Sequence, residues 1–336
     1  MSPGHSKNST PDPTCPAKLE PVFISKPWGR EIWYTGMEAR GESRVHTGGQ
    51  QIPISHYLHK VQGNTDVLLL KVLDPAPQTV TGDLYFEVHE EKREVYIVTH
   101  VDAHAWPAGQ GAIRFGMNQA KRQQFADDQA FRGAYLGAVQ NYAAIRQQID
   151  HHGKTIPAAE EQQARAAMEA FTQMRALSVG DVVRVPTWTP HALQHGVRVV
   201  EFQTPTYERY IISFAQKVVT QDHWDSAHAI AHMHLDAPAA EQFEQVGPGI
   251  ERIASFADFN VWRADLSACG GELTLPKQLP YAVCMSLAQS IQICGQEPTN
   301  PLELAAEEAC FVPRAALAQL SIRGPHGQVL IAAPGL

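Results

Sequence analysis

The apolar positions along the chain follow two different periodicities. Between about residues 26 and 106 they fall in short runs, such as "DVLLLKVLD", "LYFEVH" and "EVYIV", that are rich in β-branched and aromatic residues. Gly, Asp and Pro separate these runs, which is typical of short strands joined by turns. Similar runs resume at "DVVRVP", "VRVVEFQTP" and "RYIISF", and again from about residue 250. The pattern predicts β structure on both sides of a middle region of another kind.

That middle region, residues 118–177, has the periodicity of an amphipathic helix. Its apolar residues recur at steps of three and four, at Phe131, Tyr135, Val139, Tyr142, Ile145 and Ile149. A second helix is expected after Pro157, because proline is tolerated in a first helical turn and Glu160 and Glu161 suit a helix N-terminus. The stretch therefore predicts a helical insertion, and its apolar stripe needs a partner surface beside the β structure.

The stretch "LYFEVHEEKREVYIV", residues 84–98, predicts a hairpin that carries candidate metal ligands. Alternate side chains of a strand share one face, so Glu87 and His89 project together. If the chain reverses at the polar run 90–93, Glu94 returns over them. Two carboxylates and an imidazole suit a divalent metal that keeps an open coordination position. The alternative is an exposed hairpin with ordinary surface charges.

A second stretch, "GDVVRVPTWTPHALQHG" at residues 180–196, supplies a fourth candidate ligand. Pro186 and Pro190 restrict the loop before His191, so this imidazole is presented in a fixed direction. On its own, a histidine in such a loop is usually a surface residue. Taken with the hairpin, it completes a ligand set of Glu87, His89, Glu94 and His191.

Composition and charge limit the class of partner. The chain has 336 residues, 44% of them apolar and 18% charged, and a formal net charge of −8. This describes a globular protein without a basic stripe, which argues against nucleic acid as a partner but leaves an anionic small substrate open. The most apolar short run, "VLLLKVL", is far too short to cross a membrane.

The N-terminus and the cysteines indicate the compartment. Residues 1–25 lack the apolar core of a secretory signal and are expected to be a disordered leader. The five cysteines are odd in number and form no C-x-x-C pair, so buried thiols are expected in place of a disulfide framework. A reducing cytoplasm fits best.

The two ligand stretches resemble the metal motifs of the cupin superfamily. The first is similar to H-x-H-x(4)-E, with Glu87 where the first histidine usually stands. The second is similar to G-x(5)-P-x-G-x(2)-H, matched by Gly180, Pro186 and His191, with Trp188 in place of the inner glycine.

Further stretches narrow the resemblance to type I mannose-6-phosphate isomerases. "SKPWGREIW" resembles their K-P-W-G opening, "DVLLLKVLD" their strand before the metal strand, and "KREVYIV" their K-x-E segment, with Lys92 two before Glu94. "VEFQTPTYERY" resembles a segment that places Glu201 and Arg209 at substrate-contacting positions. The sequence also departs from the family. Glu87 replaces its glutamine ligand, Tyr85 its serine and Glu90 its proline, and the segment from Glu201 to Arg209 is shorter and lacks its aspartate.

The resemblance implies a mainly β fold of two cupin jelly-roll barrels with an α-helical insertion. The expected division is a leader at 1–25, a metal-binding cupin domain at 26–117 and 178–236, the helical insertion at 118–177, and a C-terminal β domain at 237–336. The insertion is expected to cap the mouth of the first barrel.

The implied function is a metal-dependent aldose–ketose isomerase, converting mannose 6-phosphate to fructose 6-phosphate through a cis-enediol. Glu87, His89, Glu94 and His191 would hold one Zn²⁺, with Mn²⁺ or Fe²⁺ possible because a carboxylate replaces an amide. The catalytic candidates are Arg209, Lys92 and Glu201, and Lys92, Arg209 and Tyr85 are expected to bind a sugar or sugar phosphate. Neither a membrane nor nucleic acid is expected as a partner.

Two alternatives remain at this point. A sugar-binding cupin could keep the metal and lose isomerisation, an alternative that Tyr85 and the shortened segment before Arg209 favour. A cupin dioxygenase would need a set of two histidines and one carboxylate, and the predicted set has two carboxylates and a cation beside it. Metal analysis and an assay on mannose 6-phosphate separate these possibilities.

Overall fold

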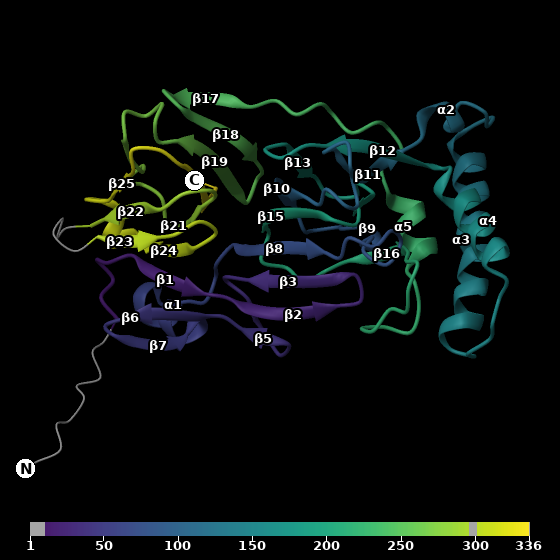
Figure 1. Cartoon of the computed structure of the whole chain (residues 1–336), viewed down its shortest axis with the longest axis horizontal. Helices are drawn as coiled ribbons and strands as arrows, with labels where there is room; N and C mark the ends of the chain where they lie inside the picture. The colour runs from purple at the N-terminus through teal and green to yellow at the C-terminus, as the bar shows by residue number, and fades with distance from the viewer. Residues whose placement is uncertain (1–10, 296–300, 336) are drawn as a thin grey trace, which may run out of the picture. The chain divides into compact units, whose positions relative to one another are not determined.

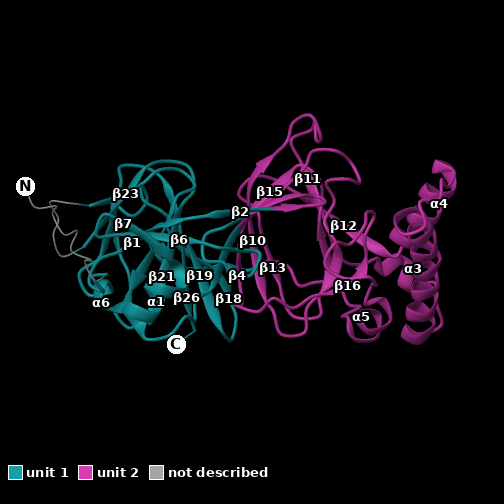
Figure 2. Ribbon diagram, turned by 90° about the horizontal axis from the view of Figure 1, so that it is seen from below, with its two compact units in different colours: residues 1–24, 32–71, 242–336 teal, residues 25–31, 72–241 magenta. Residues whose placement is uncertain are grey.

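The computed structural model describes residues 11–295 and 301–335 of the chain (Figure 1). They form a mainly β fold with two compact units, which Figure 2 colours separately. The first unit comprises residues 1–24, 32–71 and 242–336, and the second comprises residues 25–31 and 72–241. The predicted class, two β units with a helical insertion, is confirmed.

The first unit contains two larger antiparallel sheets and one two-stranded antiparallel sheet. A nine-stranded sheet has the order β17-β18-β19-β26-β21-β24-β1-β6-β7, and a four-stranded sheet has the order β20-β25-β22-β23. The elements are β1 (Ala17–Glu20), β4 (Met37–Glu38), β5 (Gly41–Glu42), β6 (Arg44–Thr47), β7 (Gln50–Pro53), α1 (Ile54–Gln62), β17 (Glu244–Gly247), β18 (Ile250–Ser255), β19 (Phe259–Asp265), β20 (Glu272–Thr274), β21 (Tyr281–Ser286), β22 (Ile291–Cys294), β23 (Leu302–Leu304), β24 (Ala309–Pro313), α6 (Arg314–Leu317), β25 (Ser321–Arg323) and β26 (Gln328–Pro334).

One apolar core joins these two sheets. Leu273, Ile293 and Ile322 of the smaller sheet belong to the same buried cluster as Val312 and Ile331 of the larger one. This is the arrangement of a β-sandwich, in which the inner faces of two sheets share a core.

The second unit also contains two sheets, and it carries the helices of the insertion. A six-stranded sheet has the order β13-β10-β15-β8-β3-β2, and a five-stranded sheet has the order β12-β11-β14-β9-β16. The elements are β2 (Val22–Lys26), β3 (Gly29–Trp33), β8 (Leu69–Pro75), β9 (Phe86–Val88), β10 (Glu94–Val101), β11 (Gly111–Met117), α2 (Gln119–Arg122), α3 (Asp128–Asp150), α4 (Ala158–Glu169), β12 (Thr172–Leu177), β13 (Val182–Val185), β14 (His191–Leu193), β15 (Val197–Gln203), β16 (Tyr210–Ser213) and α5 (Ser226–His232). β2, β3 and β8 have residues in both units.

The two sheets of the second unit enclose one core. Tyr96, Val98 and Val199 of the six-stranded sheet cluster with Ile113 and Ile211 of the five-stranded sheet. Successive side chains of a strand point to opposite faces, so every second residue of the five-stranded sheet faces this core and the others face outward.

The helices cover the outer side of the five-stranded sheet (Figure 1). Asp127 caps α3 by accepting a hydrogen bond from the Ala130 N–H at 2.8 Å. The predicted stripe of α3 is buried from Phe131 to Ile145 and packs with Phe86 and Val88 of β9. The insertion thus lies on the sheet face opposite to the side chain of Glu87, which corrects the expected position at the barrel mouth.

Three boundaries differ from those expected. Residues 1–10 of the predicted leader lie outside the described residues, but β1 begins at Ala17 and pairs with both β24 and β6, so the end of that segment is ordered. Residues 172–177 form β12, which pairs with β11, so the insertion ends before them. Residues 32–71 fall in the unit that contains the C-terminal segment, because β6 pairs with β1.

Within the described residues, no helix combines the length and apolar character needed to cross a membrane. All five cysteines are free thiols, and Cys284, Cys294 and Cys310 are buried.

Candidate metal centre

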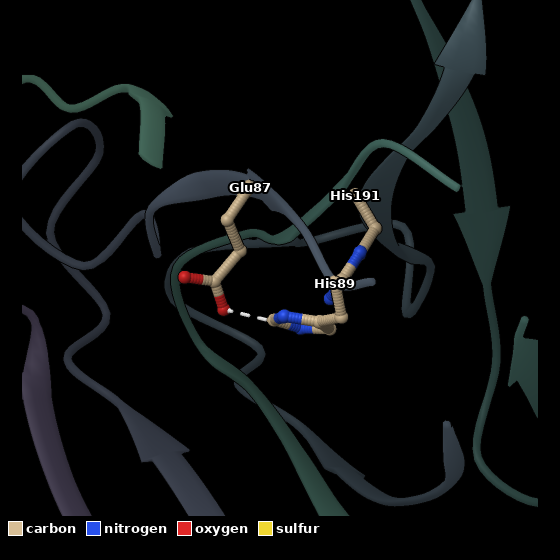
Figure 3. Close-up of side chains that lie close together, drawn as sticks. All are labelled: Glu87, His89 and His191. Carbon is tan, nitrogen blue, oxygen red and sulfur yellow. Dashed lines mark ion pairs between the residues drawn. The ribbon is translucent and has the colours of Figure 1, made fainter. Parts of the chain in front are cut away.

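β9 and its neighbours bring three candidate ligands together. In the sheet, Glu87 of β9 lies directly opposite His191 of β14 on one side and Ile211 of β16 on the other. His89 follows two residues after Glu87, on the same side of the chain. Figure 3 shows that the side chains of Glu87, His89 and His191 converge. One ligand atom from each lies within 4.8 Å of the other two.

Glu94 contacts both imidazoles of this cluster. One carboxylate oxygen of Glu94 lies 3.4 Å from Nε2 of His89, and the other lies 3.1 Å from Nε2 of His191. Glu87 is 3.8 Å from the same nitrogen of His89. The structure therefore places all four sequence-predicted ligands in one site, with Glu94 between the two histidines.

Neighbouring groups hold the imidazoles and Glu94 in place. Nδ1 of His191 lies 2.9 Å from the carbonyl oxygen of Thr189, so it carries the hydrogen and Nε2 faces Glu94. The hydroxyl of Tyr96 donates to Glu94 at 2.6 Å. The backbone N–H of Trp188 donates to the backbone carbonyl of His89 at 2.6 Å, which links the second motif to the first.

Trp188 adopts a backbone conformation that glycine adopts most easily. Its φ is 58°, in the left-handed region, where bulky residues are uncommon. Glycine occupies this position in the motif that the sequence resembles, and the φ of Trp188 is one that glycine adopts without steric cost. The indole stacks on Tyr210 at 5.8 Å between ring centroids and contacts His232 at 5.1 Å.

Lys92 and Glu94 form a buried ion pair beside the histidines. Nζ of Lys92 lies 2.6 Å from Oε1 of Glu94, and both side chains are less than one-tenth exposed. Burial alone would raise the pKa of Glu94, but Lys92 and the two histidines hold it well below its usual value. Burial likewise opposes a charged Lys92, but Glu94, Glu87 and Glu201 raise its pKa above its usual value. Both groups are therefore charged near neutral pH.

Several polar atoms of the cluster are buried without a hydrogen-bond partner. They are Oε2 of Glu87, Nδ1 and Nε2 of His89, and Nε2 of His191. Burying such atoms is costly unless something satisfies them. Imidazole nitrogen and carboxylate oxygen are ligands that Zn²⁺ accepts, and Mn²⁺ and Fe²⁺ accept the same donors. The residues present therefore fit a divalent cation.

The predicted substrate residues fall into two groups. Glu201 of β15 is buried, lies opposite Tyr96 in the sheet, and acts electrostatically on Lys92. Arg209 is next to β16, with its guanidinium 4.4 Å above the ring of Tyr85, and it donates to the Thr220 hydroxyl at 2.5 Å. Burial raises the pKa of the Tyr85 phenol despite this guanidinium, so the ring is neutral.

Other residues of the site were not singled out from the sequence. Thr189 acts through its carbonyl and Tyr96 through a hydroxyl two residues after Glu94, and neither was assigned a role from its motif. Glu208, next to Arg209, is a further such residue. Its carboxylate accepts hydrogen bonds from the N–H groups of residues 90, 91 and 92.

Similar folds occur among solved structures, although no family model and no curated protein matches the sequence. The mannose 6-phosphate isomerase from Bacillus subtilis has a TM-score of 0.67 and 17% identity, covering 94% of this chain and 99% of that one. A mutant of phosphomannose isomerase from Salmonella typhimurium has a TM-score of 0.69 and 13% identity, covering 96% and 100%. A zinc-bound mannose 6-phosphate isomerase gives the same values. At these identities, the likeness establishes the fold.

Proposed function

We propose that the chain is a metal-dependent aldose–ketose isomerase, with mannose 6-phosphate and fructose 6-phosphate as the reference pair of substrates. The observation that carries the proposal is the buried cluster of Glu87, His89, Glu94 and His191, which leaves ligand atoms unsatisfied beside the charged Lys92. The cluster lies in a fold similar to that of mannose 6-phosphate isomerases. The second unit, residues 25–31 and 72–241, carries the activity.

Glu87, His89, Glu94 and His191 would hold one divalent cation. Zn²⁺ is the first choice, since a similar solved isomerase contains zinc, and Mn²⁺ and Fe²⁺ fit the two carboxylates as well. When bound, such a cation supplies Lewis-acid stabilisation of a substrate oxygen. The carbonyl of Thr189 keeps Nε2 of His191 available for this role.

The charge states of the surrounding residues assign their roles in proton transfer between C1 and C2. Lys92 remains protonated near neutral pH, because nearby carboxylates raise its pKa, and Arg209 stays charged at any working pH. Neither can act as the base, so both stabilise negative charge on the cis-enediolate or on a phosphate. Glu201 is the buried carboxylate next to Lys92, and we assign it the proton transfer.

The proposed substrate is a small sugar or sugar phosphate. The net charge of −8 gives no support to nucleic acid or an anionic membrane as a partner. The free cysteines are compatible with the cytoplasm, which we propose as the location.

A sugar-binding protein without isomerase activity is the second candidate. The contact between Tyr85 and Arg209 favours it, because it engages one face of the guanidinium that the isomerase would use. In this case, sugar would bind at the metal centre without turnover.

An assay that couples fructose 6-phosphate formation to an oxidoreductase tests the proposal. Protein reconstituted with Zn²⁺, Mn²⁺ or Fe²⁺ should convert mannose 6-phosphate, and the His89→Ala and His191→Ala variants should lose both turnover and stoichiometric metal. His228→Ala removes an exposed histidine of α5 and should change neither. Sugar binding without turnover would favour the second candidate. Full metal retention in both ligand variants would contradict the metal centre.

A further inference from the structure

The turn that joins the metal ligands extends beyond the regular sheet. The last residue pair between β9 and β16 is Val88 with Tyr210. Residues 89–93 then reverse the chain before β10 begins at Glu94, so no ladder fixes this turn. The turn nevertheless carries His89 and Lys92 and leads into Glu94, so its conformation determines the distances between these three side chains.

One carboxylate gathers three consecutive backbone donors of this turn. The N–H of Glu90 donates to Oε1 of Glu208 at 2.6 Å, and those of Glu91 and Lys92 donate to Oε2 at 2.8 and 3.4 Å. Successive N–H groups that point at one anion form an anion-binding nest. Hydrogen bonds to a charged acceptor are stronger than those between neutral groups, so Glu208 strongly restrains the conformation of the turn.

The segment around Glu208 is attached to the same turn at two further points. Thr204 exchanges backbone and side-chain hydrogen bonds with Arg93, with its N–H donating to the Arg93 carbonyl and its hydroxyl oxygen accepting from the Arg93 N–H, both at 3.0 Å. The hydroxyl of Tyr210 donates to the Glu90 carboxylate at 3.1 Å. Thr204 and Tyr210 hold the edges of the turn, and Glu208 holds its centre.

We propose that Glu208 is a positioning residue that couples the metal-binding turn to Arg209. Its side chain fixes the backbone between His89 and Glu94, and its own backbone carries the adjacent Arg209. This contact then links the position of the ligands to the position of the proposed charge-stabilising guanidinium. This inference rests on the proposed metal centre, but it does not require that the substrate be a particular sugar.

A role limited to fold stability predicts a different result. A residue that only fastens a surface loop lowers the stability of the metal-free protein and leaves the affinity of a pre-formed site unchanged. A positioning residue changes the affinity for the metal, because groups that orient ligands typically change it by about 10–100-fold. Metal affinity is therefore the measurement that separates the two roles.

Co²⁺ is a suitable probe, since its visible absorption reports ligand geometry and its affinity can be measured against a chromophoric chelator. Glu208→Ala removes the acceptor, and Glu208→Gln keeps an acceptor oxygen while losing the charge. Glu91→Ala is the matched control, because Glu91 is an exposed carboxylate on the same turn and its removal changes the net charge equally. The melting temperature of each metal-free variant is measured in parallel.

Glu208→Ala should bind Co²⁺ at least about tenfold more weakly, with an altered absorption band, and Glu208→Gln should fall between it and the unaltered protein. Glu91→Ala should stay within about twofold. If Glu208→Ala does not fold, Glu208→Gln decides. Affinity equal to that of Glu91→Ala would overturn the positioning role, whatever happens to the melting temperature. An unaltered protein that binds no Co²⁺ would contradict the metal centre itself, whereas one that binds Co²⁺ but has no isomerase activity would contradict only the proposed function.

Discussion

The ion pair of Lys92 and Glu94 determines the electrostatics of the candidate site at the scale of single residues. A buried pair contributes little net stability when intact, because desolvation offsets the attraction, but removing one partner leaves an uncompensated charge. Lys18 and Glu308 form a pair of the same length, 2.6 Å, whose side chains are about one-third exposed. These two pairs differ in burial and provide a controlled comparison.

Lys92→Met should destabilise the metal-free protein by about 3 kcal/mol or more, the usual cost of leaving a buried charge without its partner. Lys18→Met removes a partly exposed pair and should cost about 1 kcal/mol or less. Urea unfolding at neutral pH measures both. Equal effects of the two substitutions would show that the Lys92 pair is not desolvated in solution.

The cost of Lys92→Met in unfolding free energy should depend on pH in a defined direction. The folded-state pKa of Glu94 lies below its ordinary value of 4.5, so the stabilisation from its charged form is present above about pH 4.5 and is lost as the pH falls towards the folded-state pKa. The difference in unfolding free energy between the unaltered protein and Lys92→Met should therefore shrink below about pH 4.5. A difference that grows on acidification would contradict this assignment.

Arg209→Lys should lower turnover of mannose 6-phosphate by on the order of a hundredfold, the size expected for loss of a preorganised charge partner. Lysine keeps the charge but not the planar fork that lies over Tyr85 and donates to Thr220. Metal content and melting temperature should be unchanged. Arg93→Lys is the control on the nearby turn, and steady-state kinetics compare the two. Turnover within about twofold in Arg209→Lys would favour the sugar-binding alternative.

At the scale of elements, local periodicity predicted which side chains share one face of a strand or of a helix. Alternation along residues 86–89 placed Glu87 and His89 together, and the predicted stripe of α3 is the face that is buried. Periodicity could not reveal which partner covers that stripe. Phe86 and Val88 make β9 apolar on the side opposite to Glu87. This side faces away from the core between the two sheets, and the helices pack against it.

The same limit explains the strand missed at residues 172–177. β12 has a mixed pattern of exposed and buried residues, and it is a strand because β11 offers it a hydrogen-bonding edge. Such a partner lies far away in the sequence and leaves no local signal. The candidate ligands could be predicted because their spacing is local, whereas Glu208 could not, because it contacts a turn 116–118 residues away.

Phe131→Ala tests whether the helices depend on their packing against the sheet. Phe131 is fully buried and contacts Phe125 at 5.5 Å and Phe171 at 5.4 Å between ring centroids. Truncating a buried phenylalanine costs about 3–5 kcal/mol, so the transition that melts the helices should move to lower temperature, as followed by circular dichroism. Gln140→Ala, at an exposed position of α3, should have little effect. A loss below about 1 kcal/mol for Phe131→Ala would show that α3 is not packed into this apolar cluster in solution.

The division of the whole molecule into two units follows from strand pairings between distant parts of the sequence, which local sequence patterns do not reveal. β1 joins β24, almost 300 residues later, and β6 follows it into the same sheet, so residues 32–71 belong to the unit with the C-terminal segment. The candidate metal ligands are all in the other unit. Each unit has its own buried core, so binding of a metal should stabilise the two units unequally.

Hydrogen exchange of the metal-free and Zn²⁺-loaded protein tests this expectation. A ligand that binds only the folded state stabilises it by about 2.7 kcal/mol at a hundred times its Kd, which slows exchange through unfolding by about a hundredfold. At that free Zn²⁺ concentration, core amides of residues 72–241 should gain protection of this order, because their exchange requires loss of the site. Core amides of β21, β24 and β26 belong to the first unit and should gain much less, unless the two units unfold in one step. Equal protection in both units would show that they form one cooperative structure. His191→Ala should remove the gain in protection everywhere, because without this ligand Zn²⁺ no longer binds the folded state preferentially.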